Sequence, residues 1–172
     1  MNLRSQTMIR ELRKSDCEAI AAQERLQGWH TSAEKYECRL ADAAAGKCVS
    51  LVAELDGTPV GYVNVYWAPE YGPFAGKGIP EIVDFGVLER CRNRGIGSML
   101  MDRAEELAGE RSSTISLAVG IHSGYGAAQR LYIRRGYIFD GSGAWYKGEI
   151  LPPYAPCVND DDLVLYMSKA IF

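Results

Sequence analysis

Residues 81–120 carry the pattern that most restricts how this chain can fold. Glu81–Val87 and Thr114–Gly120 are short apolar runs typical of strands, and Gly97–Leu107 between them has helical spacing and ends before Gly109. A strand, a helix and a second strand in this order favour parallel pairing of the two strands, with the helix as the crossover. A locally parallel sheet is therefore expected in this part of the chain.

The rest of the chain adds strands and helices on both sides of this unit. Asp56-Gly57-Thr58 is a strong hairpin signal, Ser15-Asp16 and Ser32 are expected helix N-caps, and Ala68–Pro80 is a long loop rich in Gly and Pro. The expected strands are Met8–Arg13, Val49–Leu55, Pro59–Trp67, Tyr137–Tyr146 and Leu163–Lys169, and the further helices end near Leu26, Ala45 and Arg135. The fold class is α/β or α+β.

Composition limits the kinds of protein to consider. The 172 residues, 47% of them apolar, fit one globular domain spanning 1–172. A net charge of -3 offers no basic surface for nucleic acid. No apolar run is long enough to span a bilayer, and Met1–Thr7 lacks the apolar core of a signal peptide. The five scattered cysteines predict free thiols rather than disulfides and no metal site, so a cytoplasmic location is expected.

A glycine-flanked turn, Gly95-Ile96-Gly97, opens the helix that follows the strand ending at Val87. The first N–H groups of a helix have no partner within it, and the helix dipole is positive there, so the turn suits a phosphate group. Arg92 and Arg94 add charge to the same loop. No Gly-x4-Gly-Lys-Ser/Thr occurs, and Leu100 stands where a dinucleotide loop needs its third glycine. A simple tight turn with solvated arginines is the alternative.

Two motifs resemble those of the GNAT superfamily of N-acetyltransferases. Arg92, Gly95 and Gly97 fit its pyrophosphate-loop pattern, Gln/Arg-x-x-Gly-x-Gly/Ala, and Ala128–Tyr137 resembles its second signature, Asn-x-x-Ala-x-x-Leu-Tyr followed by Gly-Phe. Tyr125 stands where the family usually has Asn, so the side-chain amide that would contact the pantetheine arm is missing, and Tyr137 replaces Phe.

The resemblance covers about Met8–Tyr146 and implies a GNAT fold. This is a mixed, mostly antiparallel sheet of about seven strands with flanking helices, splayed between strands four and five; Gly86 is the expected bulge. The implied activity is that of an acyl-CoA-dependent N-acetyltransferase with acetyl-CoA as donor; a non-catalytic CoA-binding sensor or regulatory protein is the alternative. The residues expected to bind acetyl-CoA are Val87, Leu88, Arg92, Asn93, Arg94, Gly95, Ile96, Gly97, Ser98, Tyr125, Ala128 and Tyr132.

The family reaction is direct attack of an amine on the thioester carbonyl in a ternary complex. Glu81 is the expected base, because it has the same offset from the loop as the catalytic glutamate of histone-acetylating members, and Asp84 is the alternative. In a regular strand these two side chains point to opposite faces. The Val87 N–H is the expected donor to the thioester oxygen, and Tyr132 the expected acid for the leaving thiol. Solvated carboxylates and a packed helix tyrosine are the structural alternatives.

The acceptor is expected to be a primary amine of a small molecule or peptide, held by loops. Nucleic acid and membrane are not expected partners, and a homodimer is left open. Asp160–Asp162 is interpreted as a solvated acidic turn, with attraction of a cation as the alternative. Cys91 is interpreted as a structural or surface thiol, and His122 as a surface residue, with a base as the alternative. The aromatic residues that could line an acceptor cavity are Trp29, Tyr71, Phe74, Trp145 and Tyr154.

Overall fold

The computed structural model of the protein describes residues 6–171. Met1–Ser5, most of the segment that was expected to lack a signal-peptide core, lie outside the described residues. The strands are β1 (Thr7–Glu11), β2 (Cys48–Leu55), β3 (Thr58–Tyr66), β4 (Glu81–Val87), β5 (Thr114–Gly120), β6 (Ile138–Tyr146), β7 (Glu149–Ile150) and β8 (Leu163–Ala170). The helices are α1 (Lys14–Leu26), α2 (Ala33–Ala44), α3 (Ile96–Gly109) and α4 (Gly126–Arg134), with short 3-10 turns η2 (Glu89–Cys91) and η3 (Ser123–Tyr125).

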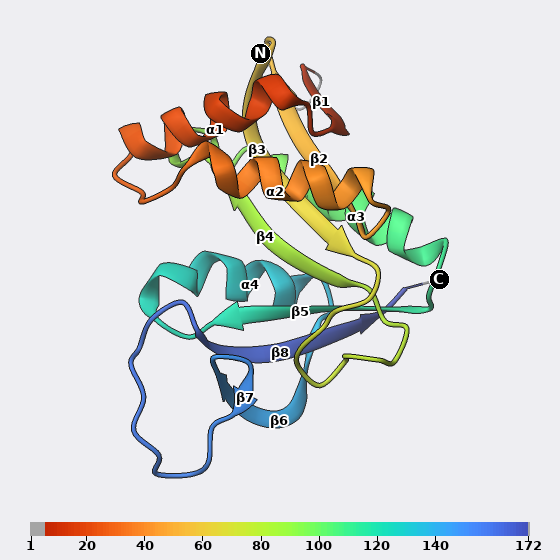
Figure 1. The fold of residues 1–172 in the computed structure, drawn as a ribbon, viewed down its shortest axis with the longest axis vertical. Coiled ribbons are helices and arrows are strands. Elements are labelled where there is room, and N and C mark those ends of the chain that lie inside the picture. The colour runs from red at the N-terminus through yellow and green to blue at the C-terminus, as the bar shows by residue number, and fades with distance from the viewer. Residues whose placement is uncertain (1–5, 172) are drawn as a thin grey trace. The chain divides into compact units, whose positions relative to one another are not determined.

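The strands follow the order β1-β2-β3-β4-β5-β8-β6-β7 (Figure 1). Strands β4 and β5 pair in parallel, whereas β1–β2, β2–β3, β5–β8, β6–β8 and β6–β7 are antiparallel. The expected mixed, mostly antiparallel sheet is therefore confirmed. Residues 6–171 contain eight strands rather than about seven, because no sequence pattern predicted the two-residue β7.

The contacts within the chain divide it into two compact units, which are described separately. The first unit comprises Met1–Tyr66 and Val83–Leu107, and the second comprises Trp67–Ile82 and Ala108–Phe172. Strand β4 begins in the second unit and ends in the first.

Neighbouring residues of β3 show how the first unit is layered. The Tyr62 hydroxyl donates to Glu24 of α1 at 2.7 Å, and the Tyr62 ring meets Tyr36 of α2 edge-on at 5.2 Å. Successive strand residues point to opposite faces, and a Cβ placed on Gly61 would lie 3.1 Å from Leu100 of α3. Helices α1 and α2 therefore cover one face of β3 and α3 covers the other, in front of and behind the strands in Figure 1.

Strand β4 is irregular at Asp84, whose φ of 52° lies in the left-handed region. The side-chain amide of Asn64 on β3 donates to the carbonyls of Val83 at 3.0 Å and Asp84 at 3.4 Å. Arg39 of α2 forms an ion pair with the Asp84 carboxylate. Side chains from β3 and α2 thus hold the irregular segment in place.

The position of this irregularity corrects the expectation for Gly86. Gly86 lies outside the left-handed region, and the left-handed residue of β4 is Asp84. Its lack of a side chain serves packing instead, because a Cβ there would lie 2.8 Å from the Cζ and Oη atoms of Tyr62. Sequence alone pointed to the glycine, and the backbone irregularity occurs two residues earlier, at Asp84.

The second unit is built on β5, β8 and β6, with β8 antiparallel to both neighbours. Strand β4 contributes Glu81 and Ile82, which pair in parallel with Ser116 and Leu117 of β5. Ser116 is fully buried and donates its N–H, at 2.8 Å, and its hydroxyl, at 3.0 Å, to the Pro80 carbonyl. The beginning of β4 is thereby fixed on β5, and the parallel pairing is limited to two residues of each strand, as expected for strands that part.

Most element boundaries lie within two residues of those expected from sequence, but helix α1 starts differently. Its N-cap is Arg13 rather than Ser15 or Asp16. The Asp16 carboxylate accepts the Arg13 N–H at 2.7 Å and forms an ion pair with Arg10 of β1 at 2.7 Å. Asp16 therefore lies in the first helical turn, where the helix dipole favours a carboxylate.

None of the helices within residues 6–171 has the length and apolar character needed to cross a bilayer.

We expect Gly86→Ala to lower the free energy of unfolding by about 1–3 kcal/mol, because the new methyl group displaces the Tyr62 ring from its place beside Glu24. Urea denaturation measures the change. Gly109→Ala is the matched control, since a Cβ there meets only Ile171 at 3.9 Å and the exposed helical position favours alanine. Equal stabilities for the two variants would contradict the packing role of Gly86.

Candidate functional site

The loop between β4 and α3 ends in a helix start with unpaired main-chain donors. Leu88 is buried, and its N–H donates to the Val60 carbonyl at 2.9 Å, which fixes where the loop leaves the sheet. Asn93 and Gly95 are left-handed, with φ of 59° and 82°. The Met99 N–H donates to the Gly95 carbonyl at 3.0 Å.

The N–H groups of Ile96, Gly97 and Ser98 precede that bond and so have no partner within the helix. They lie at the positive end of the helix dipole, where an anion is stabilised. This part of the loop has the form expected of a phosphate site.

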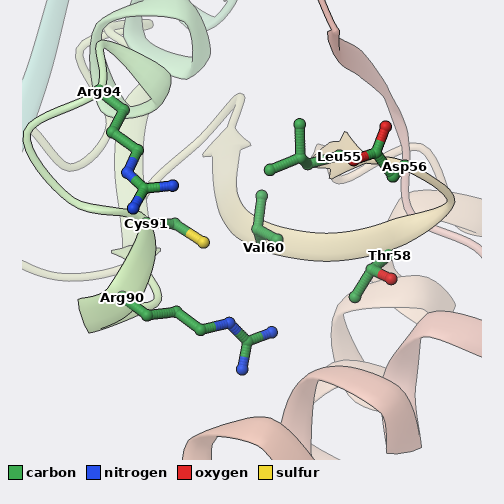
Figure 2. A pocket seen from close by; sticks show the side chains of 7 residues that line it. All are labelled: Leu55, Asp56, Thr58, Val60, Arg90, Cys91 and Arg94. Carbon is green, nitrogen blue, oxygen red and sulfur yellow. The ribbon is translucent and has the colours of Figure 1, made fainter. Parts of the chain in front are cut away.

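The two arginines of the loop make different contacts. The Arg92 Nε donates to the Val87 carbonyl at 3.1 Å, and its guanidinium lies 5.5 Å from the centre of the Trp29 ring. Arg92 also lies 3.8 Å from the Glu89 carboxylate. Arg94 instead lines a cavity beside the turn between β2 and β3 (Figure 2). Arg92 therefore contacts residues of its own unit, and the main-chain N–H groups at the start of α3 are further donors of the loop.

Glu81 opens β4 in the second unit with an unusual environment for a carboxyl group. Its Oε2 is buried and has no hydrogen-bond partner among residues 6–171. Burial raises the pKa of Glu81 from its ordinary value of 4.5 to about 7. A carboxyl with this pKa is close to half ionised at neutral pH and can both accept and release a proton.

Glu81 lies near an aromatic cluster of the same unit that we did not predict as a whole. Tyr166 of β8 contacts Phe74 of the 67–80 loop, with ring centroids 6.3 Å apart, and Trp145 of β6, at 5.3 Å. Burial, followed by the charges of Glu81 and Asp140, raises the pKa of Tyr166 to about 12. Phe74 and Trp145 thus both contact Tyr166, which belongs to neither sequence motif and was not predicted.

The other aromatic residues considered for this cavity lie elsewhere. Tyr71 is 68% exposed, and Tyr154 is fully exposed. Trp29 belongs to the first unit, where it contacts Arg92.

Asp84, the alternative base, is engaged by cations of α2. Its carboxylate accepts from Arg39 and lies 3.8 Å from the Lys35 Nζ. Arg39 in turn donates to the Tyr66 hydroxyl at 2.7 Å. Glu81, which lacks such partners among the described residues, is the better placed of the two acids to accept a proton.

Tyr132 lies in α4 and is buried. Burial, with a smaller contribution from Tyr125, raises the pKa of its phenol. The Tyr132 ring contacts Tyr137 at 5.8 Å. The phenol therefore keeps its proton at neutral pH and is in the form required of a hydrogen-bond donor. Ala128, one turn earlier in the same helix, is partly buried.

Tyr125 and His122 form a cluster with Asp161 that sequence reasoning missed. The Asp161 Oδ1 accepts from the Tyr125 hydroxyl at 2.9 Å and lies 3.0 Å from the His122 Nε2. The His122 Nδ1 accepts the Gly124 N–H at 3.1 Å, so a neutral His122 carries its proton on Nε2. A Cβ on Gly120 would lie 2.3 Å from the Tyr125 ring. Residues 122 and 161 are too far apart in sequence for spacing to have revealed the contact.

All five cysteines are free thiols, as expected from their spacing; Cys17, Cys48 and Cys91 are buried. No group of three or more His, Cys, Asp or Glu side chains suited to a metal ion occurs in the part of the chain that the structure describes.

Comparisons with known proteins give a consistent picture. Residues 7–137 match the model of the acetyltransferase (GNAT) family. An uncharacterized N-acetyltransferase from Archaeoglobus fulgidus is 38% identical over 68 residues, which are 38% of this chain and 44% of the relative. The match thus spans less than half of that relative's length.

Two solved structures share the fold. Ard1 from Thermoplasma volcanium has a TM-score of 0.69 at 20% identity, covering 97% of this chain and 99% of the other. YncA, a putative acetyltransferase from Salmonella typhimurium solved with its cofactor acetyl-CoA, has a TM-score of 0.68 at 18% identity, covering 96% of this chain and 94% of the other. At these identities the likeness concerns the fold.

The raised pKa of Glu81 predicts a pH-dependent stability difference. The unfolded chain releases this proton near pH 4.5 and the folded chain near pH 7, so ionisation of Glu81 costs folding stability as the pH rises between these values. We expect Glu81→Gln to gain about 3 kcal/mol of unfolding free energy relative to wild type between pH 4.5 and pH 8. Urea denaturation at both pH values tests this.

Glu106→Gln, on the exposed face of α3, is the control and should show a much smaller change over the same range. A pH-independent difference between Glu81→Gln and wild type would show that the Glu81 carboxyl titrates normally.

Proposed function

Because the chain belongs to the acetyltransferase (GNAT) family, we propose that it transfers the acetyl group of acetyl-CoA to a primary amine of a small molecule or peptide. The observation that carries the proposal is the Glu81 carboxyl on the strand that leads into the phosphate-type loop, whose Oε2 is buried and has no hydrogen-bond partner among the described residues. Burial raises its pKa to about 7, a value matched to proton transfer at neutral pH.

Acetyl-CoA supplies an activated thioester, and the proposal assigns its diphosphate to the first-turn N–H groups of α3. Ile96, Gly97 and Ser98 present these donors, and the left-handed Gly95 leaves the backbone open to the oxygens. The remaining contacts proposed from the family pattern involve Val87, Asn93, Arg94, Tyr125, Ala128 and Tyr132. For Leu88 and Arg92 the structure favours a role in shaping the loop, because the Leu88 N–H and the Arg92 Nε are already bonded.

In the proposed reaction the Glu81 carboxylate takes a proton from the acceptor ammonium, whose ordinary pKa near 10.4 keeps it charged at neutral pH. The neutral nitrogen attacks the thioester carbonyl, so a C–N bond forms while the Val87 N–H donates to the oxyanion. The C–S bond then breaks, and the Tyr132 phenol donates its proton to the departing sulfur. The second nitrogen proton returns through solvent to Tyr132. The balance is one amide, one CoA thiol and one proton released from Glu81.

The acceptor is proposed to be an amine on the basis of this proton chemistry and the overall negative charge. The aromatic cluster of Phe74, Trp145 and Tyr166 supports an acceptor with an apolar arm, because the cluster lies in the same unit as Glu81. The unpaired thiols support the expected cytoplasmic location.

We expect the purified chain to form CoA from acetyl-CoA with at least one primary amine in a panel of diamines, amino acids and short peptides. Thiol release and mass spectrometry of the product measure this. For wild type, kcat/KM should rise with pH through an apparent pKa near 7, because the base must be ionised. Glu81→Gln should lower kcat/KM by about 10²-fold and remove this step, since one general base contributes about 10²–10⁴-fold.

Turnover confined to alcohols or thiols would overturn the amine assignment. Tight acetyl-CoA binding without any turnover would leave the CoA-binding regulator as the function. An unchanged pH profile in Glu81→Gln would remove Glu81 as the base.

Tyr132→Phe tests the proposed acid separately. We expect kcat to fall about 10²-fold with the dissociation constant for acetyl-CoA changed less than threefold, because the hydroxyl acts only as the C–S bond breaks. Tyr137→Phe is the control and should keep kcat. Tyr137 is a buried tyrosine just before β6 whose ring contacts Tyr132. A Tyr132→Phe enzyme with wild-type kcat would make Tyr132 a packing residue.

A further inference from the structure

Strand β6 carries a large bulge opposite Tyr166 of β8. The pairing of β6 with β8 shifts between Phe139 and Ala144, so that the four residues 140–143 stand opposite Tyr166 alone. Both glycines of this stretch are left-handed, with φ of 85° and 84°, a conformation that glycine adopts without strain. A bulge bends its strand and changes the direction of the side chains beside it, and bulges are frequent next to active sites.

Hydrogen bonds within the bulge hold Asp140 and Trp145 near Tyr166. The Ser142 N–H donates to the Asp140 Oδ1 at 3.2 Å, and the Ser142 hydroxyl accepts the indole N–H of Trp145 at 2.7 Å. The Trp145 ring meets the Tyr166 ring edge-on, with centroids 5.3 Å apart. The Asp140 carboxylate is close enough to Tyr166 that its charge, after burial and the charge of Glu81, raises the pKa of that phenol.

The strand register places Glu81 on the same face of the sheet as Tyr166. Glu81 is paired with Ser116 of β5, and Ala118, two residues further along β5, is paired with Tyr166. Paired residues share a face, and so do residues two apart on one strand. Only the small side chains of Ser116 and Ala118 stand between the two on β5. A ligand on this face can therefore extend from Glu81 across Ala118 to Tyr166.

A carboxyl group stands at each end of this surface without a cationic partner. The Glu81 Oε2 is buried and has no hydrogen-bond partner among residues 6–171. Asp140 accepts the Ser142 N–H and forms no ion pair with a described side chain. The rings of the aromatic cluster border the same surface, and ring faces as well as carboxylates attract ammonium groups.

The lysines of the neighbouring strand segments do not neutralise these charges. The Lys147 ammonium lies 5.2 Å from the centre of the Tyr146 ring, and the Lys169 ammonium lies 5.8 Å from that of Tyr137. Partly buried carboxylates without a counter-ion are costly, and a cation from a ligand removes that cost. The surface therefore suits a ligand with a positive charge at each end and an apolar chain between them.

We propose that the acceptor carries two ammonium groups joined by a short alkyl chain, with the amine to be acetylated at Glu81 and the second ammonium at Asp140, beside the Trp145 and Tyr166 rings. The inference rests on the proposed function and names the substrate class of that site. Asp140 is a specificity-determining residue, and the second ammonium keeps its proton throughout. A free diamine and the N-terminal lysine of a peptide share this chemistry, so the test compares both sources.

Steady-state kinetics with acetyl-CoA compares acceptors that differ by one ammonium group. Diamines from propane-1,3-diamine to hexane-1,6-diamine are each compared with the alkylamine of the same length, and the peptide Lys-Ala-Ala with norleucine-Ala-Ala. We expect kcat/KM of wild type to be about tenfold higher for the doubly charged member of at least one pair, as for one added charge-assisted contact at a partly solvated site. The pair with the larger ratio identifies the source.

Asp140→Asn tests the residue assigned to the second ammonium. The amide oxygen still accepts the Ser142 N–H, so the bulge should remain. We expect KM for the preferred acceptor to rise about tenfold, with kcat changed less than about twofold and the singly charged partner unaffected. Asp140→Glu keeps the charge and should keep most of the preference. Asp160→Asn is the matched control, because the Asp160 Oδ1 likewise accepts an N–H two residues on, and it should keep the full preference.

The outcomes separate this inference from the proposed function. Equal kcat/KM of wild type within every pair would rule out the two-cation acceptor while acetyl transfer stands, and this comparison needs no variant. A preference that survives Asp140→Asn, or that Asp160→Asn removes equally, would rule out the assignment of the second ammonium to Asp140. Acetylation of no amine at all would exclude the proposed function and this inference with it.

Discussion

The ion pair between Arg39 and Asp84 sets the form of β4, on which the candidate site depends. A left-handed residue other than glycine within a strand carries a conformational cost of about 1–2 kcal/mol and persists only where its surroundings hold it. Here Arg39 binds the Asp84 side chain, and Asn64 donates to the carbonyls on either side of the Val83–Asp84 peptide junction. The left-handed residue is therefore a fixed feature of the strand that leads into the phosphate-type loop.

The same arrangement divides two carboxyl groups of one strand into different tasks. Asp84 is charge-paired with Arg39 and lies near Lys35, so removing it would leave cations of α2 without their partner. Glu81 has a buried oxygen with no partner among the described residues, and burial raises its pKa to about 7. Asp84 therefore joins the strand to α2, whereas the Glu81 Oε2 is left without a hydrogen-bond partner among the described residues.

Local patterns predicted the elements well, because each depends on residues close in sequence. The Asp56-Gly57 turn has φ of 50° and 77°, which two-residue hairpins require, and β4 and β5 begin and end as expected. The irregularity at Asp84 could not be predicted, because it depends on Arg39, 45 residues earlier in the chain. The same holds for Tyr166 beside Trp145 and for His122 beside Asp161, contacts between residues that are far apart in the sequence. Glycine was a misleading guide at Gly86, where packing and not backbone freedom requires it.

Arg92 shows what a motif residue also does within its own unit. Its charge on a phosphate-type loop suggests direct contact with an anion, yet its Nε donates to the carbonyl at the end of β4 and its guanidinium lies over Trp29. An arginine that ties Val87 to the connection between α1 and α2 fixes where the loop turns back. The direction of the first N–H groups of α3 then follows from the glycines and the helix itself. Loop geometry is thus one physical reason for an arginine at position 92, and this geometry exposes main-chain N–H groups that suit an anion.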